Sequence, residues 1–479
     1  MVDYLSDFME GCILESLSLI LDNISTNIYV YVTMWVLGFC GLYFSFKLKF
    51  AQVWLLPDSV KYLKEKSHKG SVSSFQAIMT CTASKVGTAN IAGVATAVVV
   101  GGPGAIFWMW LMALIGSASS IVEATLAQMY KVKEKNSGLF IGGPAYYIRD
   151  ALGKKKLGIL FASLLTFCYM LAFNMLQANN MSTAFEYFIP NYRSGIWPWV
   201  IGIVFSGLVA CVVFGGIYRI SFVSSYLVPT MASVYLLVGL YIIITNITEM
   251  PRILGIIFKD AFDFQSITGG FAGSVVLLGI KRGLLSNEAG MGSAPNSAAT
   301  ADTSHPAKQG VMQILSVGID TILICSTSAF IILLSKTPMD PKMEGIPLMQ
   351  AAISSQVGVW GRYFVTVSII CFAFSAVIGN FGISEPNVLF IKDSKKVLNT
   401  LKVICILGVC GGCILDPKVV WNLADIAMAL LAVVNLVSIT MLSKKFSLCF
   451  SDYLKQRKSK EELTFNAPKC GITDTTLWK

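Results

Sequence analysis

The stretch Ser84-Lys85-Val86-Gly87-Thr88-Ala89-Asn90-Ile91-Ala92-Gly93 interrupts an apolar segment that is otherwise suited to span a membrane. A spanning helix has no ordinary use for a lysine, two glycines, a threonine and an asparagine so close together. Backbone that leaves helical geometry at membrane depth is tolerated only where protein buries it or where it lines a cavity. Many transporters hold a substrate and its coupling ion at such a broken helix. We therefore expect a break and a binding site in this stretch.

The composition indicates a polytopic membrane protein. Of the 479 residues, 55% are hydrophobic and 13% are charged, and the mean hydropathy is +0.67, whereas a soluble domain carries roughly 25% charged residues. The net charge of +10 does not indicate a nucleic-acid partner, because lysine and arginine gather in alternate loops. This positive-inside pattern predicts a multi-pass protein of the cell's inner (plasma) membrane, with its N-terminus outside and its C-terminus cytoplasmic.

Apolar runs of near-spanning length predict about eleven transmembrane helices, of which the second, seventh and ninth are interrupted by small or polar residues. They lie at about 27–46, 72–100, 104–130, 157–180, 196–216, 224–245, 264–283, 308–335, 360–380, 399–416 and 419–442. Residues 1–26 are acidic where a signal peptide would be basic, so we expect an interfacial segment there. Residues 27–442 then form the transmembrane domain, and 443–479 form a cytoplasmic tail.

Two of the interruptions form a pair. The second, Thr268-Gly269-Gly270-Phe271-Ala272-Gly273-Ser274, follows the first by about 180 residues, or five predicted helices. Because five is an odd number, the second set of helices would insert upside down relative to the first. Paired breaks in corresponding halves of a chain point to a transport site between inverted repeats. We expect the first repeat at about 72–245 and the second at about 261–442.

Other polar groups also lie inside predicted helices. Lys85 is costly at the bilayer centre, by about 2.5–3.5 kcal/mol on insertion scales, so it faces a cavity or pairs with an acid. Glu123 and Asp320 are the candidate partners, and a structural ion pair and a coupling role both stay open. The fourth predicted helix, at about 157–180, carries several amide side chains near one end. They either bind a ligand or form hydrogen bonds with neighbouring helices. These residues are Asn174, Gln177, Asn179 and Asn180.

Motifs that could suggest catalysis have simpler explanations. The polar, glycine-rich run from Lys281 to Pro295 lacks the order of a nucleotide P-loop and predicts a gate or hinge on the cytoplasmic side. Cys410 and Cys413 have CxxC spacing but lie in an apolar helix, where packing explains small residues better than a metal or redox site. The two histidines, His68 and His305, lie in predicted loops. We therefore do not expect an enzyme.

At these motifs the chain resembles the alanine or glycine:cation symporter family, also called sodium:alanine symporters. The resemblance covers about residues 20–445, and the Ser-Asn-Glu-Ala-Gly block is its most specific part. The stretches that carry it are Val86 to Ala95 with Gly101 to Trp108, Gly142 to Tyr147, Asn174 to Asn179, Arg282 to Pro295, Ile319 to Thr321 and Phe372 to Ser375. The family implies an all-α membrane protein with the LeuT-like 5+5 inverted-repeat fold of the bacterial leucine transporter and one extra N-terminal helix.

The resemblance also implies sodium-driven uptake of a small neutral amino acid, with sodium as coupling ion and no other cofactor. Gly87, Thr88 and Asn90 would cradle the substrate, and Gln177 would bind its polar end. The sodium ion would lie between the carbonyl groups of Ala83 and Val86 and a hydroxyl of helix 9, for which Ser375 is the candidate. A second unwound wall of the site would come from Gly269, Gly270 and Gly273. The expected partners are the amino acid, sodium and the lipid bilayer; the oligomeric state stays open, and a monomer is compatible with the sequence.

The chain departs from the family pattern at three positions. Ala89 replaces a usual glycine, Ala376 replaces a usual hydroxyl or large residue, and Asn380 replaces a tryptophan that would cap the pocket. A smaller, polar residue at position 380 predicts a larger pocket with an added hydrogen-bonding group. These departures leave the identity of the transported amino acid undecided. They also leave it undecided whether sodium or a proton is the coupling ion. A passive channel or a transporter-like sensor without sodium coupling is the alternative from another class.

Overall fold

The computed structural model describes residues 16–65, 71–134, 138–263, 274–335, 337–338, 343–459 and 462–478, except for the side chains of 216–225. Regular structure is almost entirely helical, which confirms the prediction of a helical protein. The strands of the described part are β1 (Val132–Lys133) and β2 (Phe140–Ile141), which pair antiparallel with Val132 opposite Ile141. This hairpin lies in a connection between two helices and is too short to organise the fold.

The N-terminal part leads directly into the broken segment. One continuous helix, Ser16–Lys47, includes η1 (Tyr29–Thr33) and α2 (Met34–Lys47), so residues 16–26 belong to the first candidate span and do not form a separate interfacial segment. Residues 1–15 lie outside the described residues. Short helices α3 (Ala51–Trp54) and α4 (Leu56–Tyr62) follow. Then α5 (Ser74–Lys85) begins at a capping box, in which Ser73 and Gln76 exchange side-chain to backbone hydrogen bonds.

The rest of the chain continues as helices joined by short connections. The broken segment is completed by α6 (Ala89–Thr96) and η2 (Ala97–Gly101). The following elements are α7 (Ala105–Met129), α8 (Pro144–Asp150), α9 (Lys155–Phe167), η3 (Cys168–Ala172), α10 (Phe173–Thr183), η4 (Tyr192–Ser194), α11 (Trp197–Val213), α12 (Gly216–Thr245), η5 (Ile247–Glu249), α13 (Met250–Ala261), α15 (Val275–Asn287), α16 (Ala294–Thr300), α17 (Pro306–Val317), η7 (Gly318–Cys325), α18 (Ser326–Leu334), α19 (Ile346–Val357), α20 (Trp360–Ile391), α21 (Lys395–Ile414), α22 (Pro417–Met441), α23 (Ser443–Ser459) and η8 (Pro468–Cys470).

Within the described residues, eight helices are long and apolar enough to cross a membrane, and nine if α5 with α6 and η2 counts as one bent span. Two of the predicted spans, at 196–216 and 264–283, correspond to shorter helices, α11 and α15. The prediction of an interrupted ninth helix is wrong: α20 runs unbroken for 32 residues and contains Pro386. Its small and polar residues serve contacts with other helices, as the site below shows.

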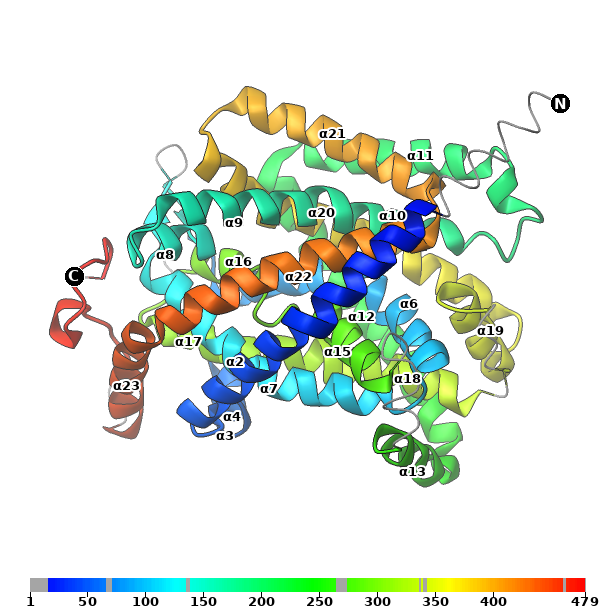
Figure 1. Ribbon diagram of the computed structural model, residues 1–479, viewed down its shortest axis with the longest axis horizontal. Helices are drawn as coiled ribbons and strands as arrows, with labels where there is room; N and C mark the ends of the chain where they lie inside the picture. Colours follow the sequence, from blue (N-terminus) through cyan, green and yellow to red (C-terminus); the bar gives the residue numbers. More distant parts are fainter. Residues whose placement is uncertain are drawn as a thin grey trace.

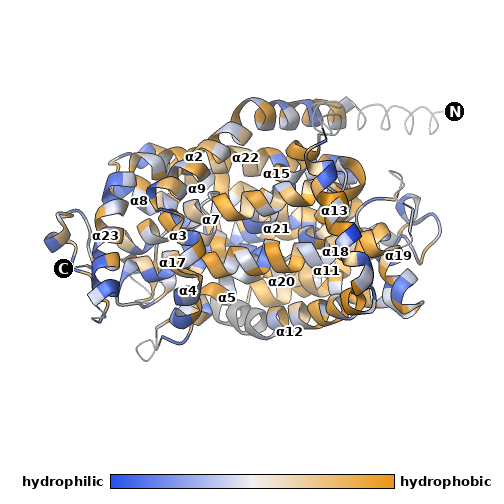
Figure 2. Ribbon diagram, turned by 90° about the horizontal axis from the view of Figure 1, so that it is seen from below, coloured by the Kyte–Doolittle hydropathy of each residue, from blue (hydrophilic) through white to orange (hydrophobic). Residues whose placement is uncertain are grey.

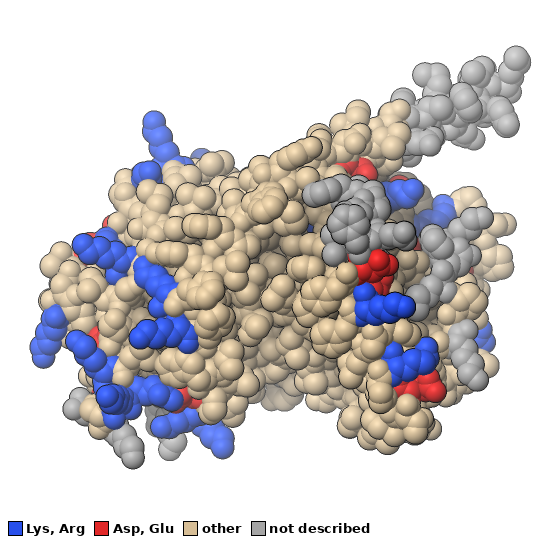
Figure 3. All heavy atoms as spheres, turned by 60° about the horizontal axis from the view of Figure 1, so that its bottom comes forward, with Lys and Arg blue, Asp and Glu red and all other residues tan. Residues whose placement is uncertain are grey.

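The helices form an elongated bundle (Figure 1). In that view α2 and α22 cross over one face, and α11 and α21 lie side by side along an edge. Apolar residues cover the middle of the bundle and hydrophilic residues gather towards its two ends (Figure 2), as expected for a bilayer-spanning body. Lysine and arginine crowd the end that carries the C-terminal tail, on the face seen in Figure 3. That end is the predicted cytoplasmic one, and the orientation itself stays a prediction.

Small residues let α21 approach α10 very closely. A Cβ atom added at Gly412 would lie 2.5 Å from the Met175 carbonyl oxygen and 2.7 Å from its Cα. At the neighbouring Gly411 nothing lies within 4 Å of an added Cβ. Asn179 on α10 reinforces the contact, because its Nδ2 donates to the carbonyl oxygens of Gly412 and Leu415 at 2.9 Å each. The Cys410–Cys413 segment is therefore a helix-packing surface, as its composition predicts.

Gly411 and Gly412 offer a matched pair for testing this packing. We expect Gly412→Ala to lower the unfolding free energy by about 1–3 kcal/mol, because backbone atoms of α10 must move. We expect Gly411→Ala to be neutral or slightly stabilising, because alanine is the better helix former and meets open space. Thermal unfolding of both purified variants in detergent measures the difference. Equal stability of the two variants would contradict the close contact of α21 with α10.

Candidate functional site

The predicted break is present, and it is three residues long. Helix α5 ends at Lys85, α6 begins at Ala89, and the two parts of the segment are bent by 42°. Val86 leaves helical geometry, with φ −75° and ψ 81°. Every residue from Cys81 to Ala95 is buried. The free backbone groups of the break therefore have to find partners inside the protein.

Gln177 on α10 supplies the partner for the break. Its Oε1 accepts hydrogen bonds from the backbone N–H of Thr88 at 2.9 Å and from the Thr88 hydroxyl at 2.7 Å. Asn180, one turn further along α10, donates through Nδ2 to Thr88 Oγ1 at 2.8 Å. An added Cβ at Gly87 would lie 2.6 Å from Gln177 Nε2, so only glycine leaves room for this amide. The structure thus brings Gly87, Thr88 and Gln177 together.

Asn90 points to a different neighbour. Its Nδ2 donates to Asp320 Oδ1 at 2.5 Å, and Asp320 lies in the π-helical element η7. The second carboxylate oxygen of Asp320 accepts from the Ser286 hydroxyl at 2.5 Å, and Ser286 Oγ lies 2.8 Å from Thr321 Oγ1. The break, α15 and η7 therefore meet through polar side chains. Ser286 and Thr321 belong to this network without having been singled out as site residues.

The described residues contain a second break at the end of α15, whereas the predicted break at 268–274 lies outside them except for Ser274. Helix α15 ends at Asn287, Glu288 adopts the left-handed conformation with φ 54°, and Gly290 and Gly292 also have positive φ. Helix α16 resumes the segment at Ala294. The predicted wall of Gly269, Gly270 and Gly273 lies outside the described residues, whereas Ser274 caps α15 by accepting from the Leu277 N–H at 3.1 Å.

A carboxylate from α7 satisfies the backbone of this second break. Glu123 accepts hydrogen bonds from the N–H groups of Gly290 at 3.2 Å and Gly292 at 3.1 Å. Asn435 on α22 also donates to Glu123, at 2.7 Å. The prediction of a polar loop over Lys281 to Pro295 is wrong for much of the run, which forms the end of α15, a buried turn and the start of α16. The gate or hinge role on the cytoplasmic side stays a prediction.

Lys85 does not form the predicted ion pair with Glu123 or Asp320. The ion pairs between described residues do not include Lys85, and its Nζ donates to the Ser316 hydroxyl at 3.4 Å. Ser316 lies one helical turn before Asp320, so the ammonium group still interacts electrostatically with the carboxylates of Asp320, Glu123 and Glu288. Lys85 is a buried cation in an acidic neighbourhood rather than one half of a salt bridge.

The predicted sodium ligands lie where α20 crosses the end of α5. An added Cβ at Gly379 would lie 3.1 Å from the Ser84 nitrogen and 3.3 Å from the carbonyl carbon of Ala83. Ser375 is one turn before Gly379 on the same face of α20, and it is buried. Its hydroxyl donates to the Phe372 carbonyl oxygen at 3.0 Å. The structure therefore places Ala83 against α20, one helical turn from Ser375, and the sodium role of Ala83, Val86 and Ser375 stays a prediction.

Asn380 is engaged by protein partners. Its Oδ1 accepts from the Ser84 hydroxyl at 2.5 Å, and its Nδ2 donates to Asn174 Oδ1 at 2.8 Å. The side chain is fully buried. Asn380 therefore connects α20 to α5 and α10, close to the first break. Of the amide side chains on α10, Gln177 and Asn180 bond the break, whereas Asn174 and Asn179 bond neighbouring helices.

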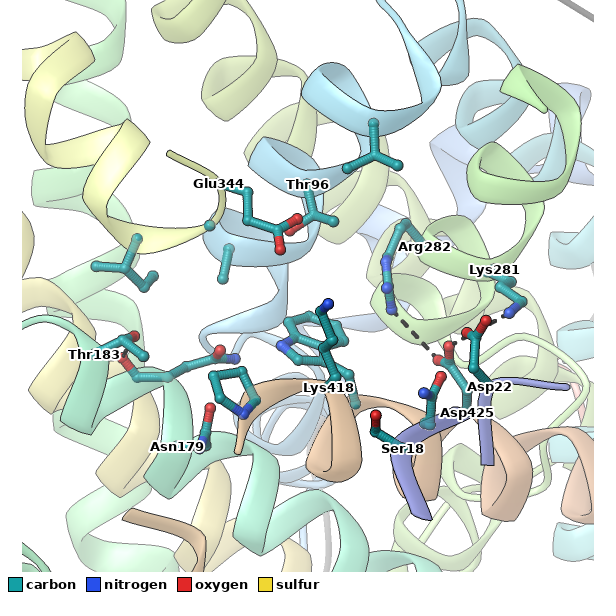
Figure 4. A pocket seen from close by; sticks show the side chains of 18 of the residues that line it. Ser18, Asp22, Thr96, Asn179, Thr183, Lys281, Arg282, Glu344, Lys418 and Asp425 are labelled. Carbon is teal, nitrogen blue, oxygen red and sulfur yellow. Dashed lines mark hydrogen bonds and ion pairs between the residues drawn. The ribbon is translucent and has the colours of Figure 1, made fainter. Parts of the chain in front are cut away.

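A cavity of about 690 Å³ leads from one end of the bundle towards the first break. Its lining includes Thr96 on α6, Asn180 on α10, Glu344 just before α19, and Lys418 in the first turn of α22. Figure 4 shows charged side chains of both signs around this space. Arg193, Glu344 and Lys418 line it, in or next to connections that the positive-inside pattern assigns to the outside. Asn180 lines the cavity and also donates to Thr88, so one side chain connects the cavity to the break.

A buried charge cluster lies beside the cavity. Arg282 Nη1 lies 3.4 Å from Asp425 Oδ1, and Lys281 Nζ lies 3.7 Å from Asp425 Oδ2 (Figure 4). The Arg282 guanidinium also stacks over the Trp421 ring, 4.1 Å from its centroid. These residues were not predicted as site residues, although Asp425 gives a signal as an acid inside an apolar run. Their pairing across α15 and α22 can respond to movement of either helix.

The opposite end of the broken helices is tied together. Val72, just before α5, forms a parallel bridge with Ala301, just after α16. Gln128 and Lys131, from the end of α7, both donate to the Ala301 carbonyl oxygen, at 2.9 Å and 2.8 Å. Burial lowers the pKa of the Lys131 ammonium to about 7. The C-terminal tail packs on the same corner, where Trp478 Nε1 donates to the Gln128 carbonyl oxygen at 2.7 Å.

A bundle of membrane-spanning length with a buried helix break, and with a cavity whose lining residue Asn180 bonds that break, is typical of membrane transport proteins. A mutant of the manganese transporter of Eremococcus coleocola has a similar fold, with a TM-score of 0.50 and 14% identity over 77% of this chain and 79% of that chain. The chain belongs to the sodium:alanine symporter family, whose pattern matches residues 14–467.

Curated relatives agree with this membership. The chain is 44% identical to the probable sodium/glutamine symporter GlnT of Bacillus subtilis, over 89% of this chain and 88% of that protein. It is 42% identical to the amino-acid carrier protein AlsT of Bacillus subtilis, over 97% and 99%. It is 34% identical to the sodium/alanine symporter AgcS of Methanococcus maripaludis, over 86% and 92%. The family is thus one of transmembrane sodium:amino acid symporters, as the resemblance implies.

The contact between Gly87 and Gln177 can be tested with one methyl group. We expect Gly87→Ala to push the Gln177 amide away from Thr88 and to reduce transport at least tenfold. The cost in folding should be small, because the displaced atoms are the end of a flexible side chain. Transport rate and thermal stability are measured on the same preparation, with Gly38→Ala as control because nothing lies within 4 Å of an added Cβ there. If Gly87→Ala transports at the unaltered rate, the contact between Gln177 and Thr88 is not part of the transport site.

Proposed function

We propose that this protein is a secondary active transporter that couples sodium entry to the uptake of a small neutral amino acid by alternating access. The observation that carries the proposal is the buried break from Val86 to Thr88, whose free N–H is satisfied by a side chain from another helix. A site of this kind can exchange one acceptor for another without unfolding the helix. Membership of a sodium:amino acid symporter family supports sodium as the coupling ion.

The carboxylate of an amino acid is the ligand that suits the break best. Thr88 already presents two donors to one acceptor oxygen, the Oε1 of Gln177. A carboxylate oxygen accepts hydrogen bonds more strongly than an amide oxygen, and the N-terminal end of α6 favours an anion. When the ligand takes the place of Oε1, the Gln177 Nε2 can donate to it. Because Gly87 has no side chain, the ligand can approach the backbone of the break. We keep Gly269, Gly270 and Gly273 as the proposed second wall of the substrate site.

The fold of the proposal is the LeuT-like 5+5 inverted repeat with one extra N-terminal helix. Two broken segments five predicted helices apart support it, one joining α5 to α6 and the other joining α15 to α16. Sodium would lie at the junction of Ala83, Val86 and Ser375, where α20 crosses α5. The expected placement is the plasma membrane, with the N-terminus outside. In that orientation the 690 Å³ cavity opens outward while the Ala301 corner closes the inner end.

Selectivity follows from what surrounds the break. Asn380 bonds Ser84 and Asn174, so its influence on the substrate would be indirect, through the position of α5. A relative that shares 44% of its residues is named for glutamine, and another is named for alanine. Alanine, glycine and glutamine are therefore the first substrates to test.

Uptake into proteoliposomes tests the proposal. The vesicles carry an inwardly directed sodium gradient and an inside-negative potential of about 100 mV. The potential alone supplies about 2.3 kcal/mol per coupled sodium ion, enough for roughly fifty-fold accumulation of the amino acid before the sodium concentration gradient is counted. We expect at least one of the three amino acids to accumulate above its outside concentration, and we expect a sodium ionophore to abolish this. Replacing sodium by potassium is the control. Equal entry in both salts without accumulation would favour a passive channel and contradict the symport.

A further inference from the structure

The segment of residues 462–478 folds back onto the helix bundle beside α23 (Figure 1). Its residues are all described, and its regular structure is limited to the short helix η8. Three of its apolar side chains are nevertheless buried: Phe465, Ile472 and Trp478 keep 7%, 2% and 8% of their surface exposed. Ordering an irregular segment costs conformational entropy, and such segments are poorly ordered unless contacts hold them. The burial therefore indicates a defined docking position.

The segment caps the end of α7. The last carbonyl groups of a helix lack partners within the helix. Trp478 Nε1 donates to one of them, the carbonyl oxygen of Gln128, at 2.7 Å. The Thr476 hydroxyl donates to the carbonyl oxygen of Lys131 at 3.4 Å, and the Lys131 ammonium lies 5.1 Å from the centroid of the Trp478 ring. Because the same ammonium donates to the Ala301 carbonyl oxygen, Lys131 connects the segment to the residues that follow α16.

The first part of the segment contacts the connection between α16 and α17. The carbonyl oxygen of Leu463 accepts from the Ser304 hydroxyl at 2.5 Å. The Phe465 ring packs against the buried His305 ring, with the two centroids 5.1 Å apart. His305 in turn caps α17, because its Nδ1 accepts from the Ala307 N–H at 3.1 Å. The segment thus holds both this connection and the first turn of α17.

Helix α23 anchors the segment from another side. Gln456 on α23 exchanges two hydrogen bonds with the backbone of Thr464: its Nε2 donates to the carbonyl oxygen at 2.7 Å, and its Oε1 accepts from the N–H at 2.9 Å. The Asp474 carboxylate pairs with Lys445 of α23 and accepts from the Tyr130 hydroxyl, just after α7, at 3.0 Å. Because α23 directly follows the spanning helix α22, the segment links that helix to the end of α7.

These contacts adjoin the corner that closes one end of the broken helices. Val72 and Ala301 meet there in a parallel bridge, and the Asp302 N–H donates to the Val72 carbonyl oxygen at 2.9 Å. The side chains of Gln128 and Lys131 hold the Ala301 carbonyl oxygen from the side of α7. A ligand can leave at this corner only when Val72 and Ala301 separate. The segment 462–478 binds the backbone of the two α7 residues that keep Ala301 in place.

We propose that residues 462–478 act as a strap that keeps this end of the transporter closed, with Trp478 as its fastening. The strap rests on the proposed function for its physiological role, since alternating access requires this end to open. With the strap docked, Gln128 and Lys131 stay in place and the form that is open only at the cavity is favoured. With the strap released, Ala301 loses this support and the opposite form gains population. The strap therefore sets the balance between the two forms.

Hydrogen exchange of the full-length protein in detergent tests the strap without any transport measurement. Backbone amide exchange reports local opening of helices and bridges. We expect Trp478→Ala to speed exchange at least tenfold in residues 71–85 and 294–305, because the corner opens more often. Asp474→Asn should act in the same direction, since it removes the charge that Lys445 binds. If Trp478→Ala does not fold, Asp474→Asn decides the matter.

Leu477→Ala is the matched control, because Leu477 lies next to Trp478 but keeps 36% of its surface exposed. This variant should leave exchange at the corner unchanged. Helices α10 and α21 supply the internal reference and should exchange alike in all the proteins. Unaltered exchange at the corner in Trp478→Ala would overturn the strap, whether or not the segment itself exchanges faster. An equal rise in every helix would overturn it as well, since Trp478 would then support only the general stability of the fold.

Uptake into proteoliposomes separates the strap from the symport. If exchange at the corner rises in Trp478→Ala but the unaltered protein accumulates no amino acid in a sodium gradient, the strap stands and the symport fails. If the unaltered protein accumulates amino acids and the corner exchanges alike in both proteins, the symport stands and the strap fails.

Discussion

The backbone N–H of Thr88 has to be satisfied at the centre of a membrane protein, where no bulk water reaches it. Gln177 meets this requirement, and much of the site follows from it. Gly87 must lack a side chain so that the amide can approach. Helix α10 must be held in place, and its contact with α21 through Asn179 and Gly412 does so. The packing of two helices away from the break thus sets the geometry of the break.

The second break solves the same problem with a different group. Glu123 accepts from Gly290 and Gly292, and its negative charge makes those hydrogen bonds strong. At the first break the acceptor is a neutral amide, which an incoming carboxylate can outcompete. We infer that the first break is the exchangeable one and the second is fixed. The charged pairs beside the cavity, Arg282 and Lys281 with Asp425, then lie between α15 and α22, where a shift of either helix would change them.

The first break could be located from sequence because polar residues stand out in an apolar run, and the structure places it at Val86 to Thr88. The second could not, because the run from Lys281 to Pro295 is polar enough to resemble a loop. Its burial depends on Asp425 and Glu123, which are distant in sequence. The polar residues of α20 suggested an interruption, but Asn380 instead bonds Ser84 and the helix stays continuous. Long-range partners of this kind leave no local pattern.

A structure with a bound amino acid tests the central claim most directly. The account predicts that the ligand carboxylate lies within hydrogen-bond distance of the Thr88 N–H and hydroxyl, with the Gln177 side-chain oxygen moved away from both. The cavity that carries Thr96 and Asn180 should lie directly above the ligand. An amino acid bound elsewhere, with both hydrogen bonds between Thr88 and Gln177 intact, would contradict the claim that this break is the binding site.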